Sequence, residues 1–291
     1  MGPLYVPPLP LLPWAAIFAA ALLAWCPRLR AASLVLAAVG YAAAFAAGQL
    51  TALALAPLAG LALAAWAIRA GRAWPLRLAG GMLFTILAAA LSLHLLPGFH
   101  NPRVITAVRF TPDAVPFTMY LNADKALVGF WLLWVLPSAV RPVRWSKSLP
   151  LGAAAALGTA LVCLALAAAL GAVGWAPKWP AAGWLWLANN LLIVALAEEA
   201  LFRGWLQRGL ELGLARAPGG QWLALLAASL VFGAAHASGG VAFVALATLS
   251  GLGYGLAYRF GGLRAAWLAH AGLNVVHFAL FTYPLRAATG A

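Results

Sequence analysis

The chain has 291 residues, of which 65% are hydrophobic and only 8% are charged. A soluble domain averages about 45–50% apolar and about 25% charged residues, so this composition excludes an ordinary soluble protein. The formal net charge is +13. Such a charge can indicate nucleic-acid binding, but here the basic residues stand in short clusters between apolar runs, as they do in the loops of membrane proteins. We therefore expect a multi-pass protein of the lipid bilayer with no nucleic-acid partner.

Apolar runs long enough to cross a hydrocarbon core of about 30 Å recur along the whole chain. They predict an all-α fold, a polytopic transmembrane bundle of roughly eight to ten helices. The candidate spans are Leu9–Cys26, Ala31–Gly48, Thr51–Ile68, Leu78–Leu96, Ala126–Val140, Pro150–Val173, Trp184–Phe202, Trp222–His236, Val241–Tyr258 and Ala265–Tyr283. The two cysteines, Cys26 and Cys163, lie inside such runs and form no disulfide or metal-binding pattern.

The charges of the connecting loops predict which side of the membrane each loop occupies. If the loop with Arg28 is cytoplasmic and the spans alternate, one side holds thirteen basic residues: Arg28, Arg30, Arg69, Arg72, Arg77, Arg141, Arg144, Lys147, Arg203, Arg208, Arg216, Arg259 and Arg264. The other side holds five: Arg103, Arg109, Lys125, Lys178 and Arg286. The asymmetry predicts this orientation, with both termini outside, in what we expect to be the plasma membrane. Tryptophans fall near the predicted span ends, as in membrane interfaces: Trp74, Trp145, Trp175, Trp179, Trp184 and Trp222.

One long segment, residues 97–125, is not predicted to cross the membrane. It is rich in turn-forming dipeptides and is expected to be an external loop. Its aromatic residues Phe110, Phe117 and Tyr120 are expected either to lie on the membrane face or to cap the helical bundle.

Acidic residues are rare, and two of the five are adjacent. Asp113, Asp124 and Glu211 are scattered, whereas Glu198 and Glu199 follow directly on an apolar run. A charge at the bilayer centre costs at least about 2.5–3.5 kcal/mol, so such residues are usually functional. The helix can continue for three further turns to Leu212, which places Glu198 near mid-membrane rather than at a solvated helix end.

Neighbouring residues of a helix point about 100° apart, so the two glutamates are expected to face different surroundings. Arg203 follows Glu199 by four positions, the favourable order for an ion pair on a helix. We expect Glu199 and Arg203 to be a structural pair. Glu198 then points into a cavity, where a poorly solvated carboxylate suits a general base. The sequence alone does not establish which glutamate acts as the base.

Histidines and an amide concentrate in the same third of the chain. His236 ends one predicted span, and His270, Asn274 and His277 recur at helical spacing on one face of the last span. A single intramembrane histidine is more often a packing residue than a catalyst. Three histidines, an amide and two acids in three of the last four spans instead indicate a site. His94 and His100 lie outside this set and are expected to be ordinary surface or packing residues.

These residues resemble the CPBP intramembrane peptidases, which include the type II CAAX prenyl endopeptidases. The family pattern is a glutamate pair with an arginine four positions after the second, then Phe-x-x-x-His, then His-x-x-x-Asn or Asp. Here these are Glu198-Glu199-Ala-Leu-Phe-Arg203, Phe232-Gly-Ala-Ala-His236 and His270-Ala-Gly-Leu-Asn274. The resemblance covers about Trp184–Tyr283, so we divide the chain into N-terminal helices of unassigned role (1–182) and a catalytic domain (183–291).

The resemblance implies hydrolysis of a peptide bond in a membrane-associated protein substrate. Glu198 and His236 would activate water, His270 and Asn274 would stabilise the oxyanion, and Glu199 and Arg203 would support them. No cofactor is favoured. Zinc remains an alternative, with Glu198, His236 and His270 as ligands, although the His-Glu-x-x-His signature is absent. His270 lies only about 9 Å beyond Arg264 along the helix, so the site is expected to open toward the cytoplasm.

Two other classes of function remain open. The same fold could serve as a non-catalytic membrane scaffold or immunity-type protein, although the intact motifs favour an enzyme. Buried glutamate and histidine also occur in proton-coupled transporters, but the first half of the chain has no counterpart of the Glu198 region. The sequence does not identify the substrate, nor whether it is prenylated.

Overall fold

The computed structural model describes residues 10–136, 141 and 143–287. The start of the predicted span Leu9–Cys26 and the end of Ala126–Val140 lie outside these residues. The chain forms two compact units, each described by itself below. The first comprises residues up to Val104, Tyr120–Leu136 and Leu192–Ala197; the second comprises Ile105–Met119, Pro137–Leu191 and the residues from Glu198 onward.

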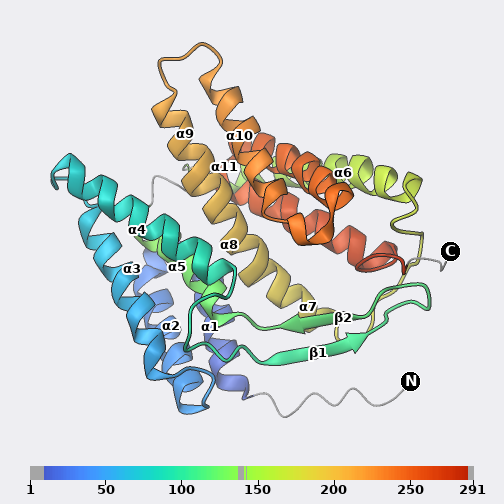
Figure 1. Cartoon of the computed structure of the whole chain (residues 1–291), viewed down its shortest axis with the longest axis horizontal. Coiled ribbons are helices and arrows are strands. Elements are labelled where there is room, and N and C mark those ends of the chain that lie inside the picture. The colour runs from blue at the N-terminus through green and yellow to red at the C-terminus, as the bar shows by residue number, and fades with distance from the viewer. Residues whose placement is uncertain (1–9, 137–140, 142, 288–291) are drawn as a thin grey trace. The chain divides into compact units, whose positions relative to one another are not determined.

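The first unit is built from antiparallel helices in chain order (Figure 1). They are α1 (Leu11–Leu23), α2 (Arg30–Ala46), α3 (Leu55–Ala67), α4 (Trp74–Ser92) and α5 (Ala123–Val135). α1 packs on α2, α3 on α4, and α4 on α5. Phe84 of α4 and Trp131 of α5 stack with ring centroids 3.8 Å apart. The Trp131 indole donates to the carbonyl of Leu61 in α3, so its one polar atom is satisfied.

The second unit contains α6, α10, α11 and a long helical run, except for Leu192–Ala197 of that run, which belong to the first unit (Figure 1). The bounds are α6 Trp145–Ala169, α10 Gly220–Ala234 and α11 Val241–Leu280. The helical run, Gly183–Gly213, consists of α7 (Gly183–Asn189), a π-helical stretch (Asn190–Ala195), α8 (Leu196–Glu199), a second π-helical stretch (Ala200–Gln207) and α9 (Arg208–Gly213). The run continues past Phe202 to Gly213, so the helix extends through Leu212 as the sequence predicted.

Helix lengths and exposed surfaces confirm a multi-pass membrane protein with an all-α fold. Five helical segments of the described residues are long and apolar enough to cross a bilayer, and three shorter apolar helices accompany them. Many large apolar side chains point outward, for example Leu157 and Leu161 of α6. All six tryptophans expected at the interface are exposed. An outer surface of this kind is stable in lipid rather than in water.

α11 contains the last two predicted spans. Its helical backbone breaks at Gly262, where φ is 73° and ψ is −174°. A side chain at this φ would be strained, so glycine permits the break between the two halves. The helix packs closely on α6, since a Cβ at Gly152 would lie 2.9 Å from the Leu268 Cβ. Small residues at such crossings let membrane helices approach one another.

The expected external loop is only partly irregular. It contains two paired strands, β1 (Arg103–Val108) and β2 (Phe117–Tyr120), and its last residues already belong to α5. The segment Arg103-Val-Ile-Thr-Ala-Val108 contains four β-branched residues, which are common in strands, but the prediction of a loop rested only on the turn dipeptides of this region. Phe110 and Phe117 both contact Tyr283, with ring centroids 6.4 and 5.0 Å away. These two aromatics therefore cap the end of α11, whereas Tyr120 is exposed.

Candidate active site

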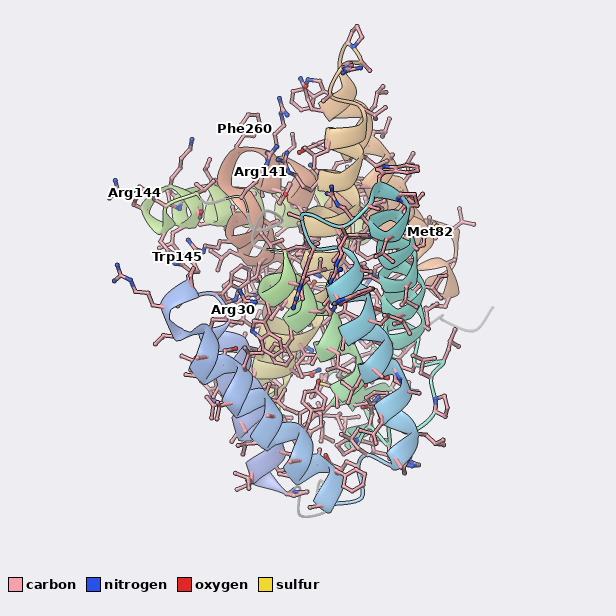
Figure 2. All side chains as sticks on the ribbon, turned by 90° about the vertical axis from the view of Figure 1, so that its left-hand side faces the viewer. Arg30, Met82, Arg141, Arg144, Trp145 and Phe260 are labelled. Carbon is pink, nitrogen blue, oxygen red and sulfur yellow. The ribbon has the colours of Figure 1, made fainter. Side chains whose placement is uncertain are left out.

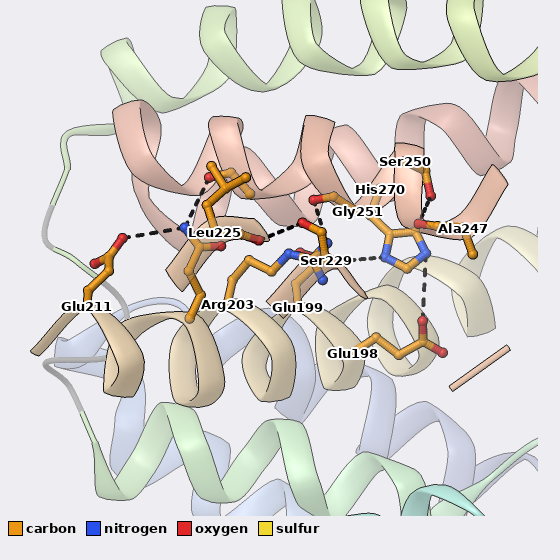
Figure 3. A network of polar contacts seen from close by, with 12 residues as sticks. Glu198, Glu199, Arg203, Glu211, Leu225, Ser229, Ala247, Ser250, Gly251 and His270 are labelled. Carbon is orange, nitrogen blue, oxygen red and sulfur yellow. Dashed lines mark hydrogen bonds and ion pairs between the residues drawn. The ribbon is translucent and has the colours of Figure 1, made fainter. Parts of the chain in front are cut away.

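The glutamate pair lies on α8, the short α-helical turn between the two π-helical stretches. π-Helical turns are rare and are frequently found at functional sites. Every residue that the sequence predicted for the site belongs to the second unit. Figure 3 shows Glu198, Glu199 and Arg203 on this run, opposite His270 and Gly251 of α11.

Glu199 is fully buried and binds two partners. Its Oε2 lies 3.2 Å from the Nε of Arg203, the ion pair that the four-residue spacing predicted. Its Oε1 lies 2.8 Å from the Nδ1 of His270. This second contact was not predicted: Glu199 joins the arginine to the imidazole and is not satisfied by the arginine alone.

Arg203 is also fully buried, and its charge is distributed over several acceptors. Besides the ion pair, its Nη2 donates to the carbonyl of Gly251 at 3.0 Å. Its guanidinium carbon lies 4.7 Å from the ring centroid of Phe232. A buried charge is tolerated only with such paired and hydrogen-bonded surroundings, so this arginine fixes the position of Glu199.

Glu198 faces the other nitrogen of the same imidazole. Its Oε2 lies 3.9 Å from the Nε2 of His270, longer than a hydrogen bond. The Glu198 side chain is 14% exposed, whereas that of Glu199 is completely buried. Glu198 is thus the member of the pair that small molecules can reach, and a water beside it can contact both the carboxylate and the imidazole.

The surroundings of His270 fix the orientation of its ring and the place of its hydrogen. An ionised carboxylate only accepts hydrogen bonds, so the Nδ1–H of His270 donates to Glu199. The Nε2 is then directed toward Glu198. The ring stacks on Tyr254, with centroids 4.6 Å apart and an interplanar angle of 9°. Hydrogen bond and stack together leave the imidazole one orientation.

His236 follows the last turn of α10, which ends at Ala234 rather than at His236 as predicted. The dipeptide Gly239-Gly240 and a short 3₁₀ turn, Ala237–Gly239, end the helix early. The Nδ1 of His236 lies 2.8 Å from the carbonyl of Phe232. Because a carbonyl only accepts, the hydrogen is on Nδ1, and Nε2 carries the lone pair that can accept a proton or bind a metal.

Phe232 connects the two histidines. Its ring centroid lies 4.7 Å from that of His236 and 5.9 Å from that of His270. Phe202 packs edge-on against the same ring at 5.0 Å. These aromatic side chains surround the polar residues with low-polarity groups, and electrostatic interactions are stronger in such surroundings than in water.

Asn274 binds a residue that the sequence did not single out. Its Nδ2 donates to the Oδ1 of Asn190 at 3.1 Å. Glu199 follows Asn190 by nine positions, which is about two and a half turns of an α-helix, so the two would face opposite sides. Here both face α11, because the π-helical stretch from Asn190 to Ala195 rotates the chain less per residue.

Asn190 and Tyr254 are the site residues that sequence reasoning missed. Asn189 and Asn190 are adjacent polar residues in an apolar run, and this pair could have indicated that Asn190 belongs to the site. Nothing in the sequence distinguished Tyr254 from a packing residue. His277, predicted on the face of His270 and Asn274, instead has its Nε2 3.2 Å from the carbonyl of Thr282.

Polar residues outside this set have structural partners of their own. In the first unit, the Nδ1 of His94 lies 2.7 Å from the Oδ2 of buried Asp124. Asn101 donates to the other oxygen of Asp124 at 2.9 Å. This cluster joins the end of α4 to the start of α5, consistent with the ordinary role expected for His94.

The sequence left a zinc ion as an alternative, with Glu198, His236 and His270 as its ligands. Among the residues that the structure describes, no group of three or more His, Cys, Asp or Glu side chains is arranged to hold a metal ion. The contact of the His270 Nδ1 with Glu199 does not exclude a metal at Nε2, because metal-binding histidines commonly donate their other N–H to a carboxylate.

One fully buried and one partly exposed carboxylate, a guanidinium, imidazoles and an amide inside apolar helices form the kind of site expected of an intramembrane hydrolase. The family model of the type II CAAX prenyl endopeptidase Rce1-like proteins matches residues 179–276, about a third of the chain. The chain therefore carries a Rce1-like domain of the CPBP family, which confirms the resemblance seen in its motifs. No curated protein and no solved structure matches the chain. In general terms, the domain is that of a CAAX-type intramembrane protease.

Proposed function

We propose that the protein is a glutamate-type intramembrane endopeptidase that cleaves a membrane-associated protein, with CAAX processing as the first reaction to test. The observation that carries this proposal is the Glu199–His270 contact. It holds the imidazole with Nε2 directed toward the accessible carboxylate of Glu198, 3.9 Å away. A base and a donor are thereby prepared before any substrate arrives.

Glu198, assisted by the Nε2 of His236, takes a proton from water while the water oxygen attacks the scissile carbonyl carbon. The carbonyl oxygen becomes an oxyanion, which accepts hydrogen bonds from His270 and Asn274. His270 donates from Nε2 when both ring nitrogens carry a hydrogen, while its Nδ1–H stays bound to the Glu199 carboxylate. When the C–N bond breaks, the proton on Glu198 passes to the leaving amine.

The test is hydrolysis of a fluorogenic farnesylated CAAX peptide by the purified protein, with the same peptide lacking the lipid for comparison. We expect Glu198→Gln and His270→Ala to abolish cleavage while the protein still inserts and folds. His100→Ala, an exposed histidine of the first unit, is the matched control and is expected to remain active. Persistent cleavage by Glu198→Gln would refute the enzyme proposal.

If neither peptide is cleaved, the substrate is sought directly. Affinity purification of Glu198→Gln from its native membrane should retain a protein that the wild type releases. A scaffold makes a different prediction: the biological phenotype would survive both Glu198→Gln and His236→Ala. A proton-coupled transporter would show proton flux in sealed vesicles that Glu198→Gln removes.

We also propose that catalysis requires no metal, because the sequence lacks the paired-ligand signature His-Glu-x-x-His. Active, purified protein should contain no stoichiometric zinc by inductively coupled plasma mass spectrometry and should retain activity in chelator. One zinc per active chain would overturn this part of the proposal.

We propose the plasma membrane as the location, with the basic loops and the opening of the site on the cytoplasmic side. With Cys26 and Cys163 replaced by serine, Arg216→Cys is expected to be protected in intact cells from an impermeant maleimide. Pro112→Cys, also exposed, is expected to react. The reverse pattern would invert the topology.

A further inference from the structure

Basic side chains gather at one end of the second unit. Arg264 of α11 donates to the carbonyl of Val143 beside α6, and Arg141 donates to the carbonyl of Arg259. These bonds bring the start of α6 and the break of α11 together at the same end. We call the following set the basic end: Arg141, Arg144, Lys147, Arg208, Arg216, Arg259 and Arg264. Figure 2 labels Arg141, Arg144, Trp145 and Phe260 in this region.

The charge of the basic end is almost uncompensated. Glu211 is the last carboxylate side chain in the sequence. It is already bound by Arg141 at 2.7 Å and by Arg208 at 3.5 Å. Arg144, Lys147 and Arg216 are exposed, and the described residues give none of them an acidic partner. The surface therefore attracts anions.

Two arginines of the basic end are held in place by tryptophan. The guanidinium of Arg259 lies 4.5 Å from the ring centroid of Trp222, and that of Arg264 lies 4.4 Å from that of Trp145. Stacking uses the face of the guanidinium and not its edge, so a stacked arginine can also bind phosphate bidentately. The Nε of Arg259 is buried and has no hydrogen-bond partner among the described residues. Topology alone requires basic loops, but it does not require arginines fixed in this way.

The same end carries exposed apolar side chains that locate it at the membrane interface. Trp145, Leu149, Trp222 and Phe260 are all exposed next to the basic residues. Tryptophan lies at the level of the lipid headgroups, and apolar residues beside it reach the acyl chains. The stacked arginines thus lie at the height of the lipid phosphates.

We propose that the basic end is a binding site for the headgroup of an anionic phospholipid, with Arg259 and Arg264 as its two fixed phosphate ligands. Arg144, Lys147 and Arg216 add attraction over a longer range. Basic residues near a bilayer surface each favour anionic lipid by about 1 kcal/mol, roughly a fivefold preference. This proposal is independent of the peptidase reaction.

The test uses the full-length protein in nanodiscs of phosphatidylcholine, with or without phosphatidylglycerol. Retained lipids are identified by native mass spectrometry, and the thermal unfolding midpoint is measured in each disc. The wild type is expected to retain phosphatidylglycerol preferentially and to unfold at a higher temperature with it. Arg259→Gln/Arg264→Gln should lose this preference about fivefold for each arginine.

Arg72→Gln is the matched control, because Arg72 also stacks on a tryptophan, Trp66, at 4.2 Å, but in the first unit. It should lose less of the lipid preference than the stacked double variant loses for each arginine. If the stacked double variant does not fold, the exposed pair Arg144→Gln/Lys147→Gln is used, with a smaller loss expected. An unchanged preference in the folded double variants, or an equal loss in Arg72→Gln, would overturn the proposal. A full thermal shift from inorganic phosphate without anionic lipid would also overturn it, since the ligand would then be a free anion.

Discussion

The Oε1 of Glu199 lies 2.8 Å from the Nδ1 of His270. The sequence predicted Glu199 only as the structural partner of Arg203, but Glu199 also binds the imidazole of His270. A carboxylate in this position orients the ring. We therefore propose Glu199 as a positioning residue, and Glu198, the more accessible acid, as the group that reacts with water.

Replacement of Glu199 by glutamine tests this division of roles. Glutamine can still occupy the space but offers a neutral amide in place of the carboxylate that holds the His270 ring, so we expect kcat to fall by about 10²- to 10⁴-fold with little change in KM. The measurement is peptide hydrolysis over a range of substrate concentrations. Asp113→Asn, at an exposed acid of the same unit, should keep wild-type values. Wild-type kcat in Glu199→Gln would show that the contact does not contribute to turnover.

Asn190 offers a second test, because it is the partner of Asn274. In Asn190→Leu the amide of Asn274 loses its acceptor and its fixed orientation. We expect kcat to fall by about tenfold or more, since a preformed oxyanion donor contributes about 10²-fold or more. Asn190→Asp, which restores an acceptor, should recover part of the loss. A purely structural role for Asn190 predicts instead that unfolding temperature and activity fall together in both variants.

The order of the membrane helices was predictable from the sequence, because the length and apolar composition of a run decide whether it can form a membrane-spanning helix. The ion pair of Glu199 with Arg203 was also predictable, because a spacing of four brings the two side chains to the same face of a helix. The π-helical winding was not. A regular α-helix places Asn190 opposite Glu199, and no residue pattern indicated wider turns.

Tertiary packing decided the other differences. The end of α10 before His236 depends on the Gly239-Gly240 turn, and the β1–β2 hairpin pairs through backbone groups that leave only a weak trace in the sequence. The double role of Glu199 required knowing that α11 lies against the glutamates, because a contact between residues 71 positions apart has no local pattern.

Arg203 should be important for stability as well as for the position of Glu199. Arg203→Met leaves the Glu199 carboxylate without its buried counter-charge, and breaking such a pair costs about 3–5 kcal/mol. Arg203→Lys should rescue little, because one ammonium does not reproduce the planar contacts with Glu199 and Gly251. Thermal unfolding in detergent measures both variants. Arg77→Met, at an exposed arginine of the first unit, is the control, and equal midpoints for Arg203→Met and Arg77→Met would contradict this assignment.

The β1–β2 loop is attached to the C-terminal segment through Asp113. The hydroxyl of Thr111 donates to Asp113, and Thr282 and Arg286 bind the same carboxylate. These contacts lower the pKa of Asp113 from its ordinary value of 3.8, with the Thr111 hydrogen bond as the largest cause. Because folding lowers the pKa of Asp113, its ionised carboxylate stabilises the attachment at pH values above the ordinary pKa. This stabilisation is lost as the pH falls through the lowered pKa.

We therefore expect the attachment to be constant at neutral and weakly acidic pH and to loosen only below about pH 4, where the carboxylate becomes protonated. Hydrogen exchange at the amides of Val115 and Ala287, which bond across this attachment, is the measurement, corrected for the intrinsic exchange rate at each pH. Asp113→Asn should exchange faster at neutral pH and lose the additional acid-induced loosening. If the wild type and Asp113→Asn respond equally to acid, another group controls the attachment.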